Sequence, residues 1–113
     1  MHEMSLAESI VDIVERTAAA NGGGKVSAVR LAIGALSHVE VEALRFCFDA
    51  VTRGGTAQGA RLEIDTPPGQ AWCMPCAATV PVARLGDACP RCGSHQLQVT
   101  QGEEMRVIDI ELI

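Results

Sequence analysis

Two segments of the chain carry apolar residues at the spacing of an amphipathic helix, in which every third or fourth side chain points to the same side. The first segment begins with Ser5–Glu8, whose residue types are typical of a helix-capping box. It closes with Asn21–Gly24, because Asn and Gly tolerate the left-handed backbone that ends helices. The pattern predicts a helix that starts in the capping box and leaves residues 1–4 as a short arm. Its apolar stripe comprises Leu6, Ile10, Ile13, Val14 and Thr17.

The second helical segment follows another capping-box sequence, Ser37–Glu40. Its apolar residues again recur every three or four positions, until Gly54 and Gly55 stop the pattern. We therefore expect a second helix, one face of which is made by Val41, Leu44, Phe48 and Val51.

Three other segments alternate apolar and polar residues, as expected for strands. They are Lys25–Ile33, Ala60–Asp65 and Met105–Ile113. Thr66–Gly69 contains two prolines and ends the second of them, since proline cannot donate to a strand ladder. The order helix, strand, helix, strand and, after an insertion, strand predicts an α/β fold with a small three-stranded sheet and two helices.

The insertion, residues 70–100, has few large apolar side chains and cannot form a core unaided. We expect it to be a four-cysteine, zinc-ribbon-like domain. The predicted domain organisation is therefore an α/β domain made by residues 1–69 and 101–113, and a metal domain made by residues 70–100.

Four of the five cysteines form two C-x-x-C pairs, separated by twelve residues that can form a hairpin and bring both pairs to one ion. The pairs are Cys73 with Cys76 and Cys89 with Cys92. A closed shell of four thiolates is typical of structural Zn(II) and leaves no open position for a substrate. Metal binding worth about 10–16 kcal/mol can fold such a segment in place of a core. We interpret these cysteines as structural zinc ligands.

Three details leave other interpretations open. Cys89–Gly93 has the sequence of a rubredoxin knuckle, in which the metal is iron, and sulfur spacing does not separate the two metals. His95 could replace one thiolate, although a solvent-facing histidine is the simpler interpretation. Cys47 stands between two phenylalanines of the second helix and is interpreted as a small core residue.

Composition narrows the class of function. The chain has 113 residues, 48% hydrophobic and 20% charged, which is typical of a globular domain. Nine basic against fourteen acidic residues give a formal net charge of −5, which argues against sequence-independent nucleic-acid binding. No apolar run approaches the roughly 18 residues of a membrane span, and the first residues lack the features of a signal peptide. With cysteines patterned for metal binding, we expect a cytoplasmic protein.

His2 is the least expected feature of the sequence, because it adjoins the α-amine of Met1. The amine, the amide nitrogens of His2 and Glu3, and the His2 imidazole can lie in one plane, an arrangement that suits Ni(II) or Cu(II). Zn(II) has no such preference. Spacing alone leaves open that this is an ordinary disordered chain end.

The sequence resembles the HypA family of nickel-iron hydrogenase maturation proteins over nearly its whole length. The matching stretches, together with the two cysteine pairs, are Met1–Ser5, Val29–Ser37, Glu42–Phe48 and Gly102–Met105. Two positions depart from the family pattern: Ala77 stands where many members have glycine, and Ala35 where glutamate is frequent.

The resemblance implies a small α/β nickel domain with an inserted zinc domain, in a protein that is not an enzyme. His2 would be the nickel ligand, helped by the amine of Met1 and nearby amides, with Glu3 adjusting the site. Ni(II) would be transient cargo, and Zn(II) would stay bound by the four cysteines. The implied partners are a HypB-type GTPase and the large subunit of nickel-iron hydrogenase, or urease in some members. A homodimer is a further candidate, and neither nucleic acid nor a membrane is implied.

Two other classes of function are compatible with the motifs. One is a zinc-ribbon module that binds protein or nucleic acid and has no nickel function. Its nucleic-acid form is weakened because residues 70–100 carry only Arg84 and Arg91 against Asp87. The other is a thiol oxidoreductase, in which both C-x-x-C pairs would have to be free of metal. Zinc content of the purified protein separates these classes.

Overall fold

The computed structural model describes residues 2–113, and the chain divides into two units. The first unit comprises the described residues up to Ala32, Val39–Asp65 and Arg106–Ile113. The second comprises Ile33–His38 and Thr66–Met105. The second unit therefore includes the turn after the first strand, which the sequence pattern did not assign to it.

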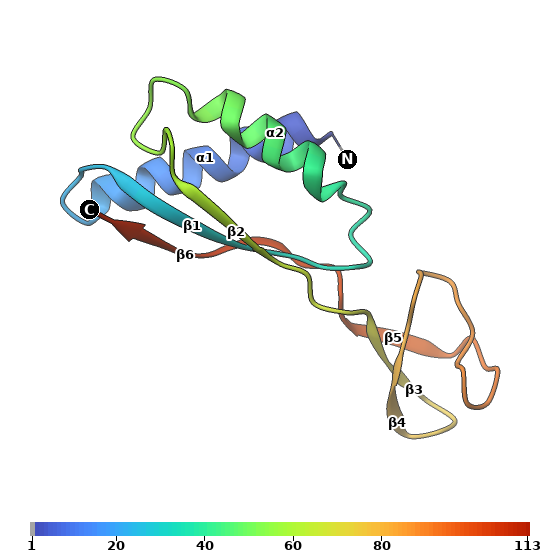
Figure 1. Cartoon of the computed structure of the whole chain (residues 1–113). Helices are drawn as coiled ribbons and strands as arrows, with labels where there is room; N and C mark the ends of the chain where they lie inside the picture. The colour runs from blue at the N-terminus through green and yellow to red at the C-terminus, as the bar shows by residue number, and fades with distance from the viewer. Residues whose placement is uncertain (1) are drawn as a thin grey trace. The chain divides into compact units, whose positions relative to one another are not determined.

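Two helices and a three-stranded sheet form the first unit, so the predicted α/β class is confirmed. The helices lie on the same face of the sheet (Figure 1) and pack against each other. In the sheet the strand order is β2-β1-β6, and β1 runs parallel to β2 with Ala28 opposite Arg61. The elements are α1 (Glu3–Ala20), β1 (Val26–Ile33), α2 (Val41–Thr52), β2 (Arg61–Asp65) and β6 (Met105–Leu112).

The start of α1 differs from the sequence prediction. The helix begins at Glu3 with His2 as its N-cap, because the Leu6 N–H donates to the His2 carbonyl at 3.1 Å. Ser5 therefore lies inside the first turn and caps nothing. The prediction of a short arm over residues 1–4 is wrong for Glu3 and Met4, which are helical; His2 precedes the helix as its N-cap, and Met1 lies outside the described residues.

The buried face of α1 also differs, since alanines contribute to it and Ile13 and Thr17 are exposed. The prediction weighted large side chains, whereas small ones let a helix approach its neighbours closely. In this helix the buried residues are Ala7, Ile10, Val11, Val14 and Ala18.

The predicted capping box ahead of α2 does not form. Ser37 belongs to a turn in which its N–H donates to the Gly34 carbonyl at 3.0 Å, and His38 has a left-handed backbone with φ of 62°. The N-cap is instead Glu40, whose own side chain accepts a hydrogen bond from the Glu42 N–H at 3.3 Å. Helix α2 then buries Leu44 and Phe48 as expected.

The second unit contains an antiparallel sheet in the order β4-β3-β5. Its strands are β3 (Gln70–Cys73), β4 (Ala78–Pro81) and β5 (Leu97–Gln101). A small apolar cluster of Leu36, Ala71 and Val82 supports the sheet, with Leu97 and Val99 packed against it. Leu36 comes from the turn after β1, so the core of this unit draws on a residue far away in the sequence.

Close backbone contacts hold that turn in the second unit. The N–H of Gly34 donates to the Glu104 carbonyl at 2.8 Å, and the N–H of Leu36 donates to the Gly102 carbonyl at 2.7 Å. A Cβ atom at Gly34 would overlap the carbonyl of Gly102. Only glycine fits there, because the backbone of Gly102 cannot move without breaking these bonds.

Neither α1 nor α2 combines the length and apolar composition that a membrane-spanning helix needs, within the part of the chain that the structure describes.

We expect Gly34→Ala to lower the free energy of unfolding by about 3 kcal/mol, because the added methyl group must displace backbone. Gly24→Ala is the comparison variant: unlike Gly34, Gly24 has a positive φ, of 99°, and it faces open space, so its substitution adds backbone strain without a steric overlap. It should cost only about 1 kcal/mol, the backbone strain of an L-residue. Denaturant unfolding measures both variants, and equal losses would contradict the steric explanation.

Candidate metal centres

Four cysteine sulfurs converge in the second unit. Cys73 ends β3 and Cys76 follows in the turn to β4, while Cys89 and Cys92 lie in the loop before β5. Their ligand atoms all lie within 4.8 Å of one another. The Sγ atoms of Cys73 and Cys92 are 3.6 Å apart, and those of Cys76 and Cys89 are 4.0 Å apart. The hairpin thus brings both C-x-x-C pairs to one point.

This spacing fits a tetrahedral metal ion. Metal–sulfur bonds of about 2.3 Å in a tetrahedron place the sulfurs about 3.8 Å apart. The separations of 3.6 and 4.0 Å fall on either side of that value. His95 is exposed and does not belong to the group of converging ligand atoms among residues 2–113.

The thiols differ in how readily they ionise. Burial raises the pKa of Cys89, but N–H groups of Cys92 and Arg91 donate to its sulfur and, with the neighbouring thiols, lower the pKa to about 6. The sulfurs of Cys92 and Cys73, together with burial, raise the pKa of Cys76 to about 12. A second thiolate beside the first is repelled, and a divalent cation removes that repulsion by attracting every sulfur. The donor set therefore fits a dication.

Each of the two C-x-x-C knuckles, Cys73–Cys76 and Cys89–Cys92, is followed directly by a residue with a left-handed backbone. Gly93 has φ of 76° and donates its N–H to the Cys89 carbonyl at 2.8 Å. Ala77 has φ of 50° and donates to the Met74 carbonyl at 3.3 Å. Glycine adopts this conformation without strain and alanine does not. The first knuckle therefore carries a local penalty that the second does not.

Two of the residues predicted as a nickel site, His2 and Glu3, lie at the start of α1. His2 is exposed, and Glu3 is the first helical residue. The carboxylate of Glu3 accepts a hydrogen bond from the N–H of Glu40 at 3.1 Å, and this bond, followed by one from its own N–H, holds the pKa of Glu3 below its usual value. The sequence did not predict the contact with Glu40, because 37 residues separate the two positions.

The cysteine cluster is the one place among residues 2–113 where three or more Cys, His, Asp or Glu ligand atoms converge. A metal site at the N-terminus would therefore depend on main-chain nitrogens besides the His2 imidazole. The amine of Met1, predicted as one of them, lies outside the described residues.

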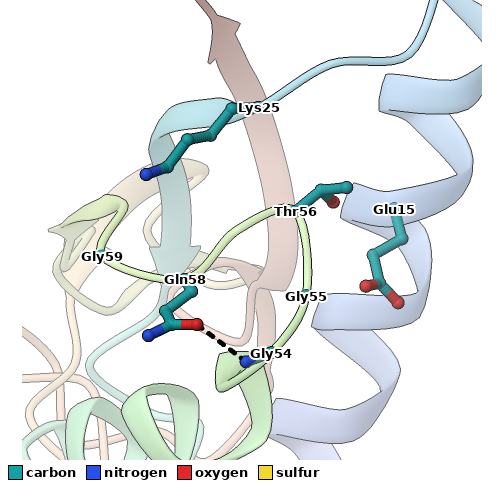
Figure 2. Close-up of a pocket in the computed structure, with 7 residues that line it drawn as sticks. All are labelled: Glu15, Lys25, Gly54, Gly55, Thr56, Gln58 and Gly59. Atoms are coloured by element: carbon teal, nitrogen blue, oxygen red, sulfur yellow. Dashed lines mark hydrogen bonds between the residues drawn. The ribbon is translucent and has the colours of Figure 1, made fainter.

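A separate pocket lies between α1 and the loop after α2 (Figure 2) and contains none of the predicted site residues. The loop is closed by a hydrogen bond of 2.8 Å from the Gly54 N–H to the Gln58 side chain. The pocket is also lined by Lys25, the single lysine of the chain, and by Glu15. No histidine or cysteine is among the lining residues, so the pocket offers no soft or nitrogen metal ligands.

Comparison with known proteins gives consistent matches over the whole chain. Residues 1–112 match the family model HypA, described as hydrogenase/urease nickel incorporation, metallochaperone. The chain is 58% identical to the hydrogenase maturation factor HypA of Azotobacter vinelandii over 112 residues, which is 99% of either chain. It is 59% identical to that of Albidiferax ferrireducens with the same coverage.

Two solved structures share the fold. The solution structure of the Ni metallochaperone HypA from Helicobacter pylori has a TM-score of 0.73 and 26% sequence identity, covering 100% of this chain and 98% of the other. Another structure, described as the solution structure of HypA protein, has a TM-score of 0.74 and 27% identity, covering 100% and 97%.

We expect Ala77→Gly to tighten metal binding, because glycine removes about 1 kcal/mol of backbone strain from the folded knuckle. The apparent affinity for added Zn(II), measured by competition with a chelator, should rise about fivefold. Gly93→Ala is the reciprocal variant and should lower it by a similar factor. Opposite signs or no change in both variants would show that the left-handed positions do not limit metal binding.

Proposed function

The chain belongs to the HypA family of nickel-incorporation metallochaperones, and we propose that it binds Ni(II) at its N-terminus and delivers it during maturation of nickel-iron hydrogenase. A Zn(II) ion held by the four cysteines has a structural role in this proposal. The observation that carries it is the match of residues 1–112 to the family model. The convergence of four sulfurs at tetrahedral spacing supports the second metal.

The proposed nickel ligands are the His2 imidazole, the amine of Met1 and the amide nitrogens of His2 and Glu3. The position of His2 and Glu3 at the start of α1 favours this use, because the first N–H groups of a helix have no intrahelical partner. Binding metal through these nitrogens therefore breaks no hydrogen bond of the helix ladder, and only the Glu3 N–H gives up a bond, the one to its own carboxylate. The positive end of the helix dipole also stabilises the negative charge of a deprotonated amide. Four nitrogens in one plane suit Ni(II).

Exposure of His2 is consistent with transfer of the metal. A cargo ion must leave, and ligands at the surface can be replaced one at a time by those of a recipient protein. The cysteine cluster has the opposite character, since Cys73 and Cys89 are buried and four thiolates complete the coordination of Zn(II). We propose that only the N-terminal metal is exchanged.

The zinc-binding part takes no part in catalysis in this proposal, and the protein is not an enzyme. We keep the functional division into a nickel domain, residues 1–69 and 101–113, and a zinc domain, residues 70–100. The proposed partners are a HypB-type GTPase and the large subunit of nickel-iron hydrogenase, with a second copy of the chain as a further candidate. We propose that these partners interact in the cytoplasm. The net charge of −5 favours a protein over a nucleic acid as partner.

His2→Ala should abolish one-to-one Ni(II) binding in isothermal titration and leave zinc content and circular dichroism unchanged, because His2 lies outside the apolar core. The other two histidines provide matched controls, since both are exposed. His95→Ala and His38→Asn should bind nickel like the parent; asparagine is chosen because it tolerates the left-handed backbone of His38. Extending the N-terminus by one residue should act like His2→Ala, by displacing the amine. Normal nickel binding by His2→Ala would refute the site.

Cys73→Ser should release zinc and unfold mainly the second unit, whose apolar cluster is too small to fold it without the metal. Cys47→Ser is the matched control, because Cys47 lies on α2 and is not one of the four converging cysteines. Metal analysis should find one zinc per chain in the control and none in Cys73→Ser. Amide exchange should show that β1 and α1 stay protected in both; loss of that protection in Cys73→Ser would show that the domains do not fold separately.

A further inference from the structure

The N-terminus of α2 has an incomplete cap within its own sequence. In a capping box, a Glu or Gln three residues after the N-cap accepts a hydrogen bond from the N-cap N–H. The N-cap of α2 is Glu40, and the residue three positions later is Ala43, which has no acceptor. The missing acceptor comes from the other helix: the carboxylate of Glu3 lies 3.1 Å from the Glu40 nitrogen.

The same hydrogen bond ties down the first turn of α1. Helix ends fray, and the first residues of a chain are poorly ordered unless something holds them. Glu3 is the first helical residue and follows directly on His2, the N-cap. The two helices pack against each other, and the Glu3–Glu40 bond adds a contact at the end of α1 that carries His2.

A direct role of the Glu3 side chain in binding metal competes with this contact. Its carboxylate accepts from two main-chain N–H groups, that of Glu40 and its own. A metal bound by the carboxylate would withdraw negative charge from its oxygens and weaken the bond from the Glu40 N–H. The side chain thus serves better to hold the backbone than to hold the ion.

We propose that Glu3 is a positioning residue: its carboxylate completes the cap of α2 and thereby fixes the first turn of α1, His2 included, for nickel binding. This inference rests on the proposed nickel function. Without the contact, the nitrogen ligands have to be ordered when the metal binds, and the entropy of that ordering weakens binding.

Two substitutions of Glu3 separate positioning from direct ligation. Glu3→Gln keeps an oxygen that can accept from the Glu40 N–H, but the neutral side-chain amide of glutamine is a poor ligand for Ni(II). Glu3→Ala loses the acceptor altogether. We expect Glu3→Gln to bind Ni(II) within about twofold of the parent, and Glu3→Ala to bind about three- to tenfold more weakly, the value of one hydrogen bond. The d–d absorption bands of bound Ni(II) should keep their positions in both variants, because the ligands are unchanged.

Glu8→Ala is the matched control on α1, since Glu8 is exposed and its side chain makes no hydrogen bond or ion pair with the residues that the structure describes. It should bind nickel like the parent. Equal losses in Glu3→Gln and Glu3→Ala, or a shift of the absorption bands, would overturn the proposal in favour of direct ligation.

A second pair of variants tests the contact from its other end. Glu40 has φ of −81°, which proline can adopt, so Glu40→Pro removes the N–H donor. Glu40→Ala keeps that N–H and loses only the side chain that accepts from Glu42. We expect Glu40→Pro to bind nickel about three- to tenfold more weakly than Glu40→Ala. In a Glu3→Ala background the two should be equal, because the bond is already lost. An unchanged difference in that background would overturn the proposal.

Amide exchange of the metal-free protein tests the contact without nickel. The Glu40 amide should be protected in the parent and should exchange faster in Glu3→Ala, with zinc content unchanged. Failure of the parent itself to bind Ni(II) would overturn both this inference and the proposed function. Normal nickel binding by Glu3→Ala, with nickel bound by the parent, would overturn the positioning role alone.

Discussion

The start of α1 at Glu3 is the constraint on which the proposed nickel chemistry depends. A helix that began at Ser5 would leave His2 and Glu3 on a loose chain end, and each nickel ion would have to order that end before it could bind. With His2 as the N-cap, its backbone is already set by the hydrogen bond from Leu6, and the neighbouring amide nitrogens are free of helix bonds. Much of the ordering entropy is then lost during folding and not during metal binding.

This arrangement still leaves the proposed cargo site easy to empty. The His2 side chain is exposed, so ligands of a recipient protein can approach it from solvent. The cysteine cluster shows the contrast within one small chain. There the ligands are soft thiols on two knuckles, and the cost of crowding several thiolates keeps the pKa of Cys76 near 12 until a cation joins them. One site is suited to exchange and the other to retention.

Most of the fold could be predicted from the sequence, because it depends on local periodicity. Strand β2 was expected over Ala60–Asp65 and spans Arg61–Asp65, and the cysteine cluster followed from spacing alone. The errors arose where two local signals competed. Ser5 and Ser37 both stand in capping-box sequences, yet neither is an N-cap. The N-cap of α1 is His2, three residues before Ser5, and that of α2 is Glu40, three residues after Ser37. A capping-box sequence shows that a helix could start at that residue, but it does not decide where the helix starts.

The other features that the sequence could not predict are contacts between distant segments. Leu36 joins the apolar cluster of the second unit, and Gly34 leaves room for the carbonyl of Gly102, although neither residue shows a local pattern that would place it there. Glu3 is a similar case: next to His2 it suggests a metal ligand, and only the position of the Glu40 N–H indicates another use. The neighbours of a carboxylate in the sequence rarely reveal its role, because that role depends on which donors the fold brings within about 3 Å. In this chain the donor is a helix cap, and the residue beside the proposed metal ligand thereby becomes part of the packing between two helices.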